Sequence, residues 1–346
     1  MSSTVRRTTN TPGARRLAAA ALALSSCLAL AAPAATASAA PAADAVPTVF
    51  FGDSYTANFG LSPVNHMDSE RGWCFQAKDN YPAVAARTLA GKGVDLTVQS
   101  DVSCGGAVAA NVWTKQQLPF GAGEVDEQWK ALKGDTKLVV GSMGGNMLGF
   151  VEIIKQCSDK LREPSLLPGE PVDGDKPAAE CKDFFETGDG KQWLDFKLQV
   201  AEDDLDQMIQ VLHYKAWDAD VVLVGYPRLV PQDTAKCAKA APGQSELPFA
   251  DIPQGALPVL DQAEKRLNDA MKKVAEENDA AFVDLYAQTG SNTACDGADR
   301  AIGGLLEPSN LDLIGQKVPW YAHPNEKGRD LQAQHVAAKI EEVLKG

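Results

Sequence analysis

Five short runs of consecutive apolar residues, rich in β-branched side chains, recur along the chain. Such runs are typical of parallel strands covered on both faces, because a half-exposed strand would alternate apolar and polar residues. The runs lie at Thr48–Phe51, Val94–Gln99, Leu138–Ser142, Val221–Val224 and Ala281–Asp284. We therefore expect five buried strands in one parallel sheet.

Stretches with helical periodicity separate these runs and close the chain. Between Leu260 and Val274, apolar residues recur every three or four positions, with charged residues on the opposite face. The segments Trp193–Tyr214 and Lys327–Leu344 have the same kind of spacing. The alternation of strand and helix predicts the α/β class, specifically a three-layer α/β/α sandwich around a five-stranded parallel sheet.

The N-terminal segment has the layout of a secretory signal peptide. Four arginines precede an apolar run from Leu17 to about Ala32, and Ala37-Ser38-Ala39 offers small residues for cleavage. The run is short for a membrane span. We expect residues 1–39 to be a signal peptide and residues 40–346 to form a single domain. The protein is then secreted and extracellular, with no integral membrane span.

The charge balance limits the partners of the exported chain. The whole chain carries a net charge of −13, and removing the four arginines of the leader makes this −17. So acidic a chain is a poor partner for nucleic acid or an anionic membrane. We expect no nucleic-acid partner, and a monomer is the default state. Arg15-Arg16 leave the twin-arginine export route open beside the general secretory route.

Six cysteines follow the leader, an even number that indicates disulfides in an exported chain. Six cysteines allow fifteen pairings, and we favour the sequential set because each bond would close a local loop. Zinc is disfavoured, because the chain has no C-x-x-C pair and no Cys/His cluster at ligand spacing. The favoured pairs are Cys74–Cys104, Cys157–Cys181 and Cys237–Cys295.

Four short motifs carry the candidate chemistry. In parallel α/β sheets, ligands bind beyond the carboxyl ends of the strands, so motifs at strand ends share one rim. A serine, a histidine base and N–H donors aimed at an oxyanion are what ester cleavage needs. Three motifs follow the first three strands and the fourth precedes the final helix: Gly52-Asp53-Ser54, Ser103-Cys104-Gly105-Gly106-Ala107, Gly144-Gly145-Asn146 and His323-Pro324-Asn325.

In this order, the motifs resemble those of the SGNH (GDSL-type) hydrolases, esterases and lipases with a flavodoxin-like α/β/α fold. The chain is also similar to the secreted, disulfide-containing esterases of actinomycetes, over about residues 47–340. The resemblance implies that Ser54 is the nucleophile and His323 the general base. It also implies an oxyanion hole made of the Ser54 and Gly106 backbone N–H groups and the Asn146 side-chain amide.

Two positions depart from the family pattern. Met147 and Trp320 stand where the family often has aspartate, and Trp320 lies three residues before His323. A histidine base needs an acceptor at its other ring nitrogen. Resemblance to relatives that use a backbone carbonyl predicts a Ser–His dyad oriented by the Trp320 main-chain oxygen. Asp312 or another distant acid is the alternative, whereas Asp53 is expected to hold the serine turn.

Other residues near the motifs have plainer interpretations. His66 could line the cleft, whereas His213 and His335 fall within helical segments and are expected to be structural. Trp73 is expected to pack rather than to contact substrate. Gly105 replaces Gly106 as the oxyanion donor if the loop is aligned one residue earlier.

The sequence thus predicts a secreted serine esterase or lipase that hydrolyses carboxylic esters through an acyl-enzyme on Ser54. The substrate is a small-molecule or lipid ester, and the lack of an obvious apolar lid helix favours short chains. The alternatives are an O-acetyl esterase on extracellular glycans, a phospholipase and, less favoured, a non-catalytic extracellular binding protein. No cofactor and no metal are expected, because His and carboxylate residues do not cluster at ligand spacing.

Overall fold

The computed structural model describes residues 45–162 and 167–345. The predicted signal peptide, residues 1–39, lies outside the described residues. A five-stranded parallel sheet runs through the domain in the order β2-β1-β5-β6-β7. Its strands are β1 (Val46–Gly52), β2 (Leu96–Asp101), β5 (Leu138–Ser142), β6 (Asp220–Val224) and β7 (Ala281–Val283).

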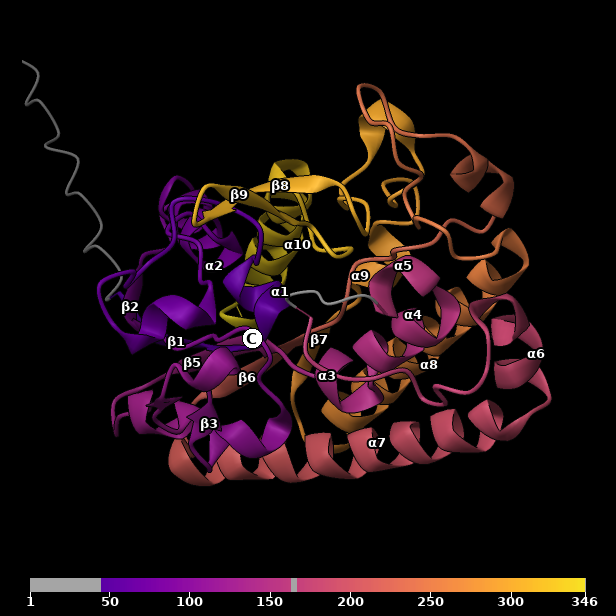
Figure 1. Cartoon of the computed structure of the whole chain (residues 1–346). Helices are drawn as coiled ribbons and strands as arrows, with labels where there is room; N and C mark the ends of the chain where they lie inside the picture. The colour runs from indigo at the N-terminus through magenta and orange to yellow at the C-terminus, as the bar shows by residue number, and fades with distance from the viewer. Residues whose placement is uncertain (1–44, 163–166, 346) are drawn as a thin grey trace, which may run out of the picture. The chain divides into compact units, whose positions relative to one another are not determined.

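Long helices cover both faces of this sheet (Figure 1). On one face lie α2 (Tyr81–Ala90) and α10 (Glu326–Val343), and on the other lie α7 (Asp189–Lys215) and α8 (Leu257–Glu277). Neighbouring strand residues enter opposite cores: Phe50 packs on the α2/α10 side and Phe51 on the other. This arrangement is the predicted three-layer α/β/α sandwich.

Shorter elements decorate the carboxyl edge of the sheet and the loops. The short helices are α1 (Ser54–Ala57), α3 (Gly145–Leu148), α4 (Phe150–Cys157), α5 (Asp159–Arg162), α6 (Cys181–Glu186) and α9 (Leu285–Gln288). Two small antiparallel pairs, which the sequence pattern did not predict, are β3 (Gln116–Gln117) with β4 (Glu124–Val125) and β8 (Pro308–Leu313) with β9 (Gln316–Pro319). None of the helices in the described ranges is both long and apolar enough to cross a membrane.

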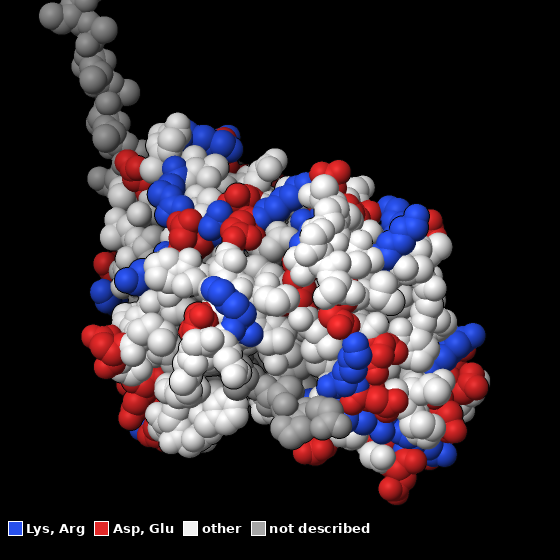
Figure 2. Space-filling view, turned by 45° about the horizontal axis from the view of Figure 1, so that its top comes forward, with Lys and Arg blue, Asp and Glu red and all other residues white. Residues whose placement is uncertain are grey.

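The predicted strands and long helices are present, and the two edge strands differ in burial. β2 begins at Leu96 rather than Val94, and its Val98 is 44% exposed, so the prediction that it is buried on both faces is wrong. β7, at the other edge, is only partly buried at Ala281 and Phe282. On the molecular face drawn in Figure 2, acidic and basic side chains are interspersed. That face therefore presents no broad basic patch for nucleic acid.

Candidate active site

The serine turn is shaped by Gly52 and Asp53. Gly52 ends β1 with a φ of 136°, and a Cβ atom there would lie 2.3 Å from Thr56 Oγ1 and 2.7 Å from the Ser142 carbonyl oxygen. Glycine is therefore required at this position. Asp53 caps α1, because its Oδ1 accepts a hydrogen bond from the Tyr55 N–H at 2.9 Å. Ser54 is the first residue of the helix, so its own N–H has no partner within the helix.

His323 meets Ser54 across the pocket. Its Nε2 lies 2.8 Å from Ser54 Oγ, and its Nδ1 lies 2.9 Å from the Trp320 carbonyl oxygen and 3.1 Å from that of Tyr321. A proton on Nδ1 is donated to these carbonyls, which leaves Nε2 free to accept the serine proton. In the described chain, no carboxylate bonds to His323. Asp312 is exposed on β8, where its Oδ1 accepts from the Gly315 N–H, so the structure does not support it as the orienting acid.

The backbone before His323 is held in an unusual conformation. Tyr321 and Ala322 have φ values of 48° and 61°, in the left-handed region that non-glycine residues rarely adopt. The Tyr55 hydroxyl fixes this turn by donating to the Ala322 carbonyl at 2.9 Å. The Trp320 indole fills the space beside Gly303, where a Cβ atom would lie 2.1 Å from the ring.

Aromatic rings enclose the imidazole. The centroids of the Tyr55 and Phe59 rings lie 4.7 Å and 5.0 Å from that of His323. Burial lowers the pKa of His323 to about 4, and the hydrogen bonds to the Trp320 and Tyr321 carbonyls oppose this shift only in part. The imidazole is therefore neutral near pH 7, which is the form a general base requires.

The groups expected to bind the oxyanion lie on two further loops of the same rim. The Gly105 N–H donates to the Cys74 carbonyl at 2.9 Å, whereas the Gly106 N–H has no acceptor among the described residues. Gly106, with a φ of 79°, is thus the better donor of the two. Asn146 Nδ2 donates one hydrogen to the Ala107 carbonyl at 2.9 Å and keeps a second for a ligand.

The position after Asn146 keeps its loop in place without the aspartate of the family pattern. Met147 is buried, and its sulfur accepts a hydrogen bond from the Ala109 N–H at 3.3 Å. The departure at Met147 therefore leaves the Asn146 amide in position.

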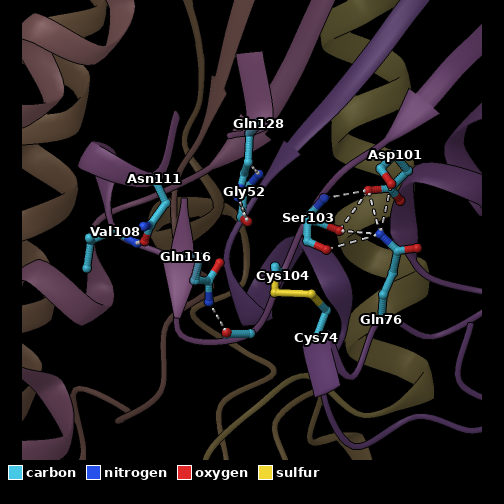
Figure 3. The surroundings of a disulfide bond; sticks show 11 residues. Gly52, Cys74, Gln76, Asp101, Ser103, Cys104, Val108, Asn111, Gln116 and Gln128 are labelled. Carbon is cyan, nitrogen blue, oxygen red and sulfur yellow. Dashed lines mark hydrogen bonds between the residues drawn. A yellow bond between two sulfur atoms is a disulfide. The ribbon is translucent and has the colours of Figure 1, made fainter. Parts of the chain in front are cut away.

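A disulfide and two glutamines brace the oxyanion loop, and a third glutamine holds Gly52 in the serine turn (Figure 3). The Cys74–Cys104 bond fixes the residue before Gly105, and Gln116 Nε2 donates to the Gly105 carbonyl at 2.7 Å. Gln76 bonds to Ser103 in the same loop, and Gln128 bonds to both backbone groups of Gly52. The other disulfides are Cys157–Cys181 and Cys237–Cys295, so the six cysteines pair in the sequential order.

Tyr226 joins the serine turn to the oxyanion helix, a role that the sequence analysis missed. Its hydroxyl donates to Asp53 Oδ2 and accepts from the Gly145 N–H at 2.7 Å. Burial raises the pKa of Asp53 to about 7, although the hydrogen bonds from Tyr226 and from the Tyr55 N–H pull it down. The one available signal was that Tyr226 follows β6 by two residues and so lies on the same rim.

Two hollows meet at Ser54 and His323. The inner pocket, of about 570 Å³ including its open part, is lined on its far side by Leu148, Ile154, Leu229, Glu264 and Leu267. The outer pocket, of about 930 Å³ including its open part, is lined by Phe59, Trp73, Phe75, Leu118 and Pro119. Trp73, which we expected only to pack, thus lines a wall of the site.

The remaining histidines lie away from Ser54. His66 is exposed and lines neither pocket. His213 bonds through Nε2 to the Asn278 carbonyl at 2.9 Å, and His335 lies on α10. Of the described histidines, His323 is therefore the one placed to act on Ser54.

Ser54 is thus bonded to His323, with the unpaired N–H groups of Ser54 and Gly106 and the Asn146 amide beside them, as the resemblance to GDSL-type hydrolases predicts. The model of the GDSL-like Lipase/Acylhydrolase family matches residues 50–331, and the chain belongs to this family. It is 69% identical over 344 residues to an esterase of Streptomyces scabiei, with 99% of each chain covered. It is 33% identical over 298 residues to Lipase 2 of Streptomyces coelicolor, covering 84% of this chain and 85% of that one. The protein is a carboxylic-ester hydrolase.

Solved structures share the fold. An extracellular lipase from Streptomyces rimosus superposes with a TM-score of 0.59 at 19% identity, covering 85% of this chain and all of that one. Phospholipase A1 from Streptomyces albidoflavus gives a TM-score of 0.55 at 20% identity, covering 86% of this chain and 99% of that one. At these identities, the likeness concerns the fold.

Proposed function

We propose that this hydrolase cleaves esters through an acyl-enzyme on Ser54, with His323 as general base and acid. The observation that carries the proposal is the 2.8 Å hydrogen bond between Ser54 Oγ and His323 Nε2, with Nδ1 held by two carbonyl oxygens. As Oγ attacks the ester carbonyl, Nε2 takes the hydroxyl proton. The resulting imidazolium then gives this proton to the departing alcohol oxygen.

The tetrahedral intermediate needs donors for its oxyanion. The Ser54 and Gly106 N–H groups and the second hydrogen of Asn146 Nδ2 are free for this role. Losing one such donor typically slows an enzyme by about 10²–10³-fold. The three donors come from loops that follow β1, β2 and β5, so their alignment depends on the bracing described above.

The acyl-enzyme is then hydrolysed by the same groups. Nε2 takes a proton from water, the hydroxide attacks the acyl carbon, and Ser54 Oγ leaves with the proton that His323 returns. The Trp320 and Tyr321 carbonyls are neutral acceptors, so they stabilise the imidazolium less than an aspartate would. The same low stability of the imidazolium keeps His323 deprotonated, and so able to act as a base, in acidic medium.

We further infer that the enzyme is exported and acts on small esters with short acyl groups. Three disulfides support export, since such bonds persist in oxidising compartments. The smaller inner pocket, closed by leucine side chains, supports a short acyl group.

A series of p-nitrophenyl esters with acyl chains of increasing length tests the proposal. We expect kcat/KM to peak at a short chain, and Ser54→Ala and His323→Ala to lose activity on every member while remaining folded. A Ser54→Ala protein with full activity would overturn the mechanism. A rate that keeps rising to long chains would overturn the substrate assignment alone.

A further inference from the structure

A carboxyl side chain that the proposed mechanism does not use lines the inner pocket. Glu264, on α8, is only 4% exposed and lines this pocket. Its Oε2 accepts a hydrogen bond from the Leu229 N–H at 3.0 Å. Its Oε1 is buried and has no hydrogen-bond partner among the described residues.

Glu264 also has no salt-bridge partner among the described residues. The nearby Arg228 is bound instead to Asp261, at 2.6 Å. Burial raises the pKa of Glu264 well above its ordinary value; the Leu229 N–H and the charge of Arg228 oppose this shift, whereas Asp261 adds to it. A buried carboxyl group without a salt bridge favours its neutral form. Because Oε2 accepts from a backbone N–H, the proton of that form belongs on Oε1, which then is a hydrogen-bond donor without an acceptor.

The pocket gives this donor no protein acceptor. A buried polar group without a partner destabilises a protein, so binding of a group that supplies the partner is favoured. Its neighbours in the pocket lining include Leu148, Leu229 and Leu267, whose side chains cannot accept a hydrogen bond. Glu264 and Ser54 line the same pocket, so a substrate bound beside Ser54 is a candidate for the missing acceptor, with water as the alternative.

The inner pocket suits the acyl part of the ester rather than the alcohol part. In the proposed mechanism the alcohol must leave before water attacks, whereas the acyl group stays on Ser54. The outer pocket is the larger of the two and contains the Gly106 loop. Departure through the outer pocket leaves the inner pocket to the acyl chain.

We propose that Glu264 determines specificity, and that the inner pocket favours acyl groups that carry an ether or hydroxyl oxygen over hydrocarbon chains of the same length. This inference rests on the function proposed above. The carboxyl O–H of Glu264 donates to that oxygen, which replaces a hydrogen bond that the pocket otherwise lacks. Removing the carboxyl group by Glu264→Leu takes away the donor, and it also leaves the Leu229 N–H without its acceptor.

Pairs of p-nitrophenyl esters that differ by one CH₂-to-oxygen replacement test this directly. The pairs are butanoate with methoxyacetate, pentanoate with 3-methoxypropanoate, and hexanoate with 4-methoxybutanoate. For each pair we take the ratio of kcat/KM for the ether ester to kcat/KM for the alkyl ester. We divide it by the same ratio of their alkaline hydrolysis rates, so that the intrinsic reactivity of the two esters cancels. We expect one chain length to favour the ether by about 10-fold in the unmodified protein, as one hydrogen bond would.

The variants separate recognition from general effects. Glu264→Leu should abolish the ether preference, and Glu264→Gln, which keeps an N–H donor, should retain part of it. The matched control is Glu276→Leu, an exposed position on the same helix, which should leave every ratio unchanged.

Two failures can be told apart. Hydrolysis of the plain alkyl esters that does not depend on Ser54 would refute the proposed function. Ser54-dependent hydrolysis with no ether preference at any length, in the unmodified protein, would refute the role of Glu264. The latter result would mean that Oε1 binds only water. This comparison uses the unmodified protein alone, so it does not depend on whether a variant folds.

Discussion

Replacing Tyr226 with phenylalanine removes one oxygen atom, the atom that joins the serine turn to the oxyanion helix. Its loss leaves Asp53 Oδ2 without its donor and the Gly145 N–H without its acceptor. Gly145 directly precedes Asn146, the donor on α3. The substitution therefore loosens the nucleophile and an oxyanion donor together. Tyr226 also lines the inner pocket, and the substitution removes its hydroxyl but keeps its ring there.

The structure sets the size of the effect and its dependence on pH. A hydrogen bond to a charged group contributes about 1.5–3 kcal/mol, and one between neutral groups about 0.5–1.5 kcal/mol. Because the pKa of Asp53 is about 7, its carboxyl is neutral at pH 5 and mostly charged at pH 8. We therefore expect Tyr226→Phe to lower the free energy of unfolding more at pH 8 than at pH 5. Urea unfolding at the two pH values measures this difference.

Activity provides the second measurement. We expect kcat to fall by about 10–100-fold with little change in KM, since the upper limit is the loss of one whole oxyanion donor, about 10²–10³-fold. The matched control is Tyr286→Phe. It removes a hydroxyl that donates a 2.8 Å hydrogen bond to Asp261, and Tyr286 lines neither pocket. The control should lose stability without losing kcat. A Tyr226→Phe enzyme with kcat within twofold of the unmodified protein would refute the positioning role.

Three further predictions follow from the site. Because the pKa of His323 is about 4, kcat/KM should stay constant as the pH falls to about 4 and should drop tenfold per pH unit below that, in protein shown to remain folded. A decline of kcat/KM that begins near pH 6.5 would contradict this. Trp320→Ala keeps the main-chain acceptor but loses a buried indole, so unfolding free energy should fall by about 3–5 kcal/mol while kcat falls less than in His323→Ala; equal kcat losses in folded proteins would count against the backbone acceptor. Replacing both Cys74 and Cys104 with serine should lower stability by about 2–4 kcal/mol in urea unfolding and also lower kcat, because the Gly106 donor lies in the loop that the disulfide holds; unchanged values of both would show that the loop needs no brace.

The arrangement of the rim could be predicted because parallel strands bring their carboxyl ends to one edge. Ser54, Gly106 and Asn146 each follow a strand that an apolar run marks in the sequence, so their proximity follows from the sheet. His323 belongs to the last loop before α10, and only the resemblance to a known family pointed to it. No local pattern predicts that this loop returns to β1.

Burial was harder to predict for residues whose exposure differs from what is usual for their residue type. Val94 and Val98 suggested a buried strand, yet β2 lies at the sheet edge, and edge position depends on strand order rather than on composition. Glu264 was counted with the charged face of its helix, because glutamate is rarely buried. Its spacing of four from Leu260 and three from Leu267 nevertheless places it in the apolar stripe. A charged residue in such a stripe is the signal that the sequence offered.

Tyr226 shows a different limit. Its partner Asp53 is 173 residues away in the chain, and the hydrogen bond depends on how β6 and β1 end relative to each other. Hydrophobic periodicity carries no information on such a pair.

In the proposed mechanism His323 activates Ser54, and covalent labelling measures that activation. The protein is incubated with a fluorophosphonate, which reacts only with an activated serine, and intact mass and peptide mapping follow the adduct over time. We expect one adduct on Ser54 in the unmodified protein, none in Ser54→Ala, and labelling slowed by orders of magnitude in His323→Ala. Labelling of Ser54 at an unchanged rate in His323→Ala, or no labelling of the unmodified protein, would contradict it.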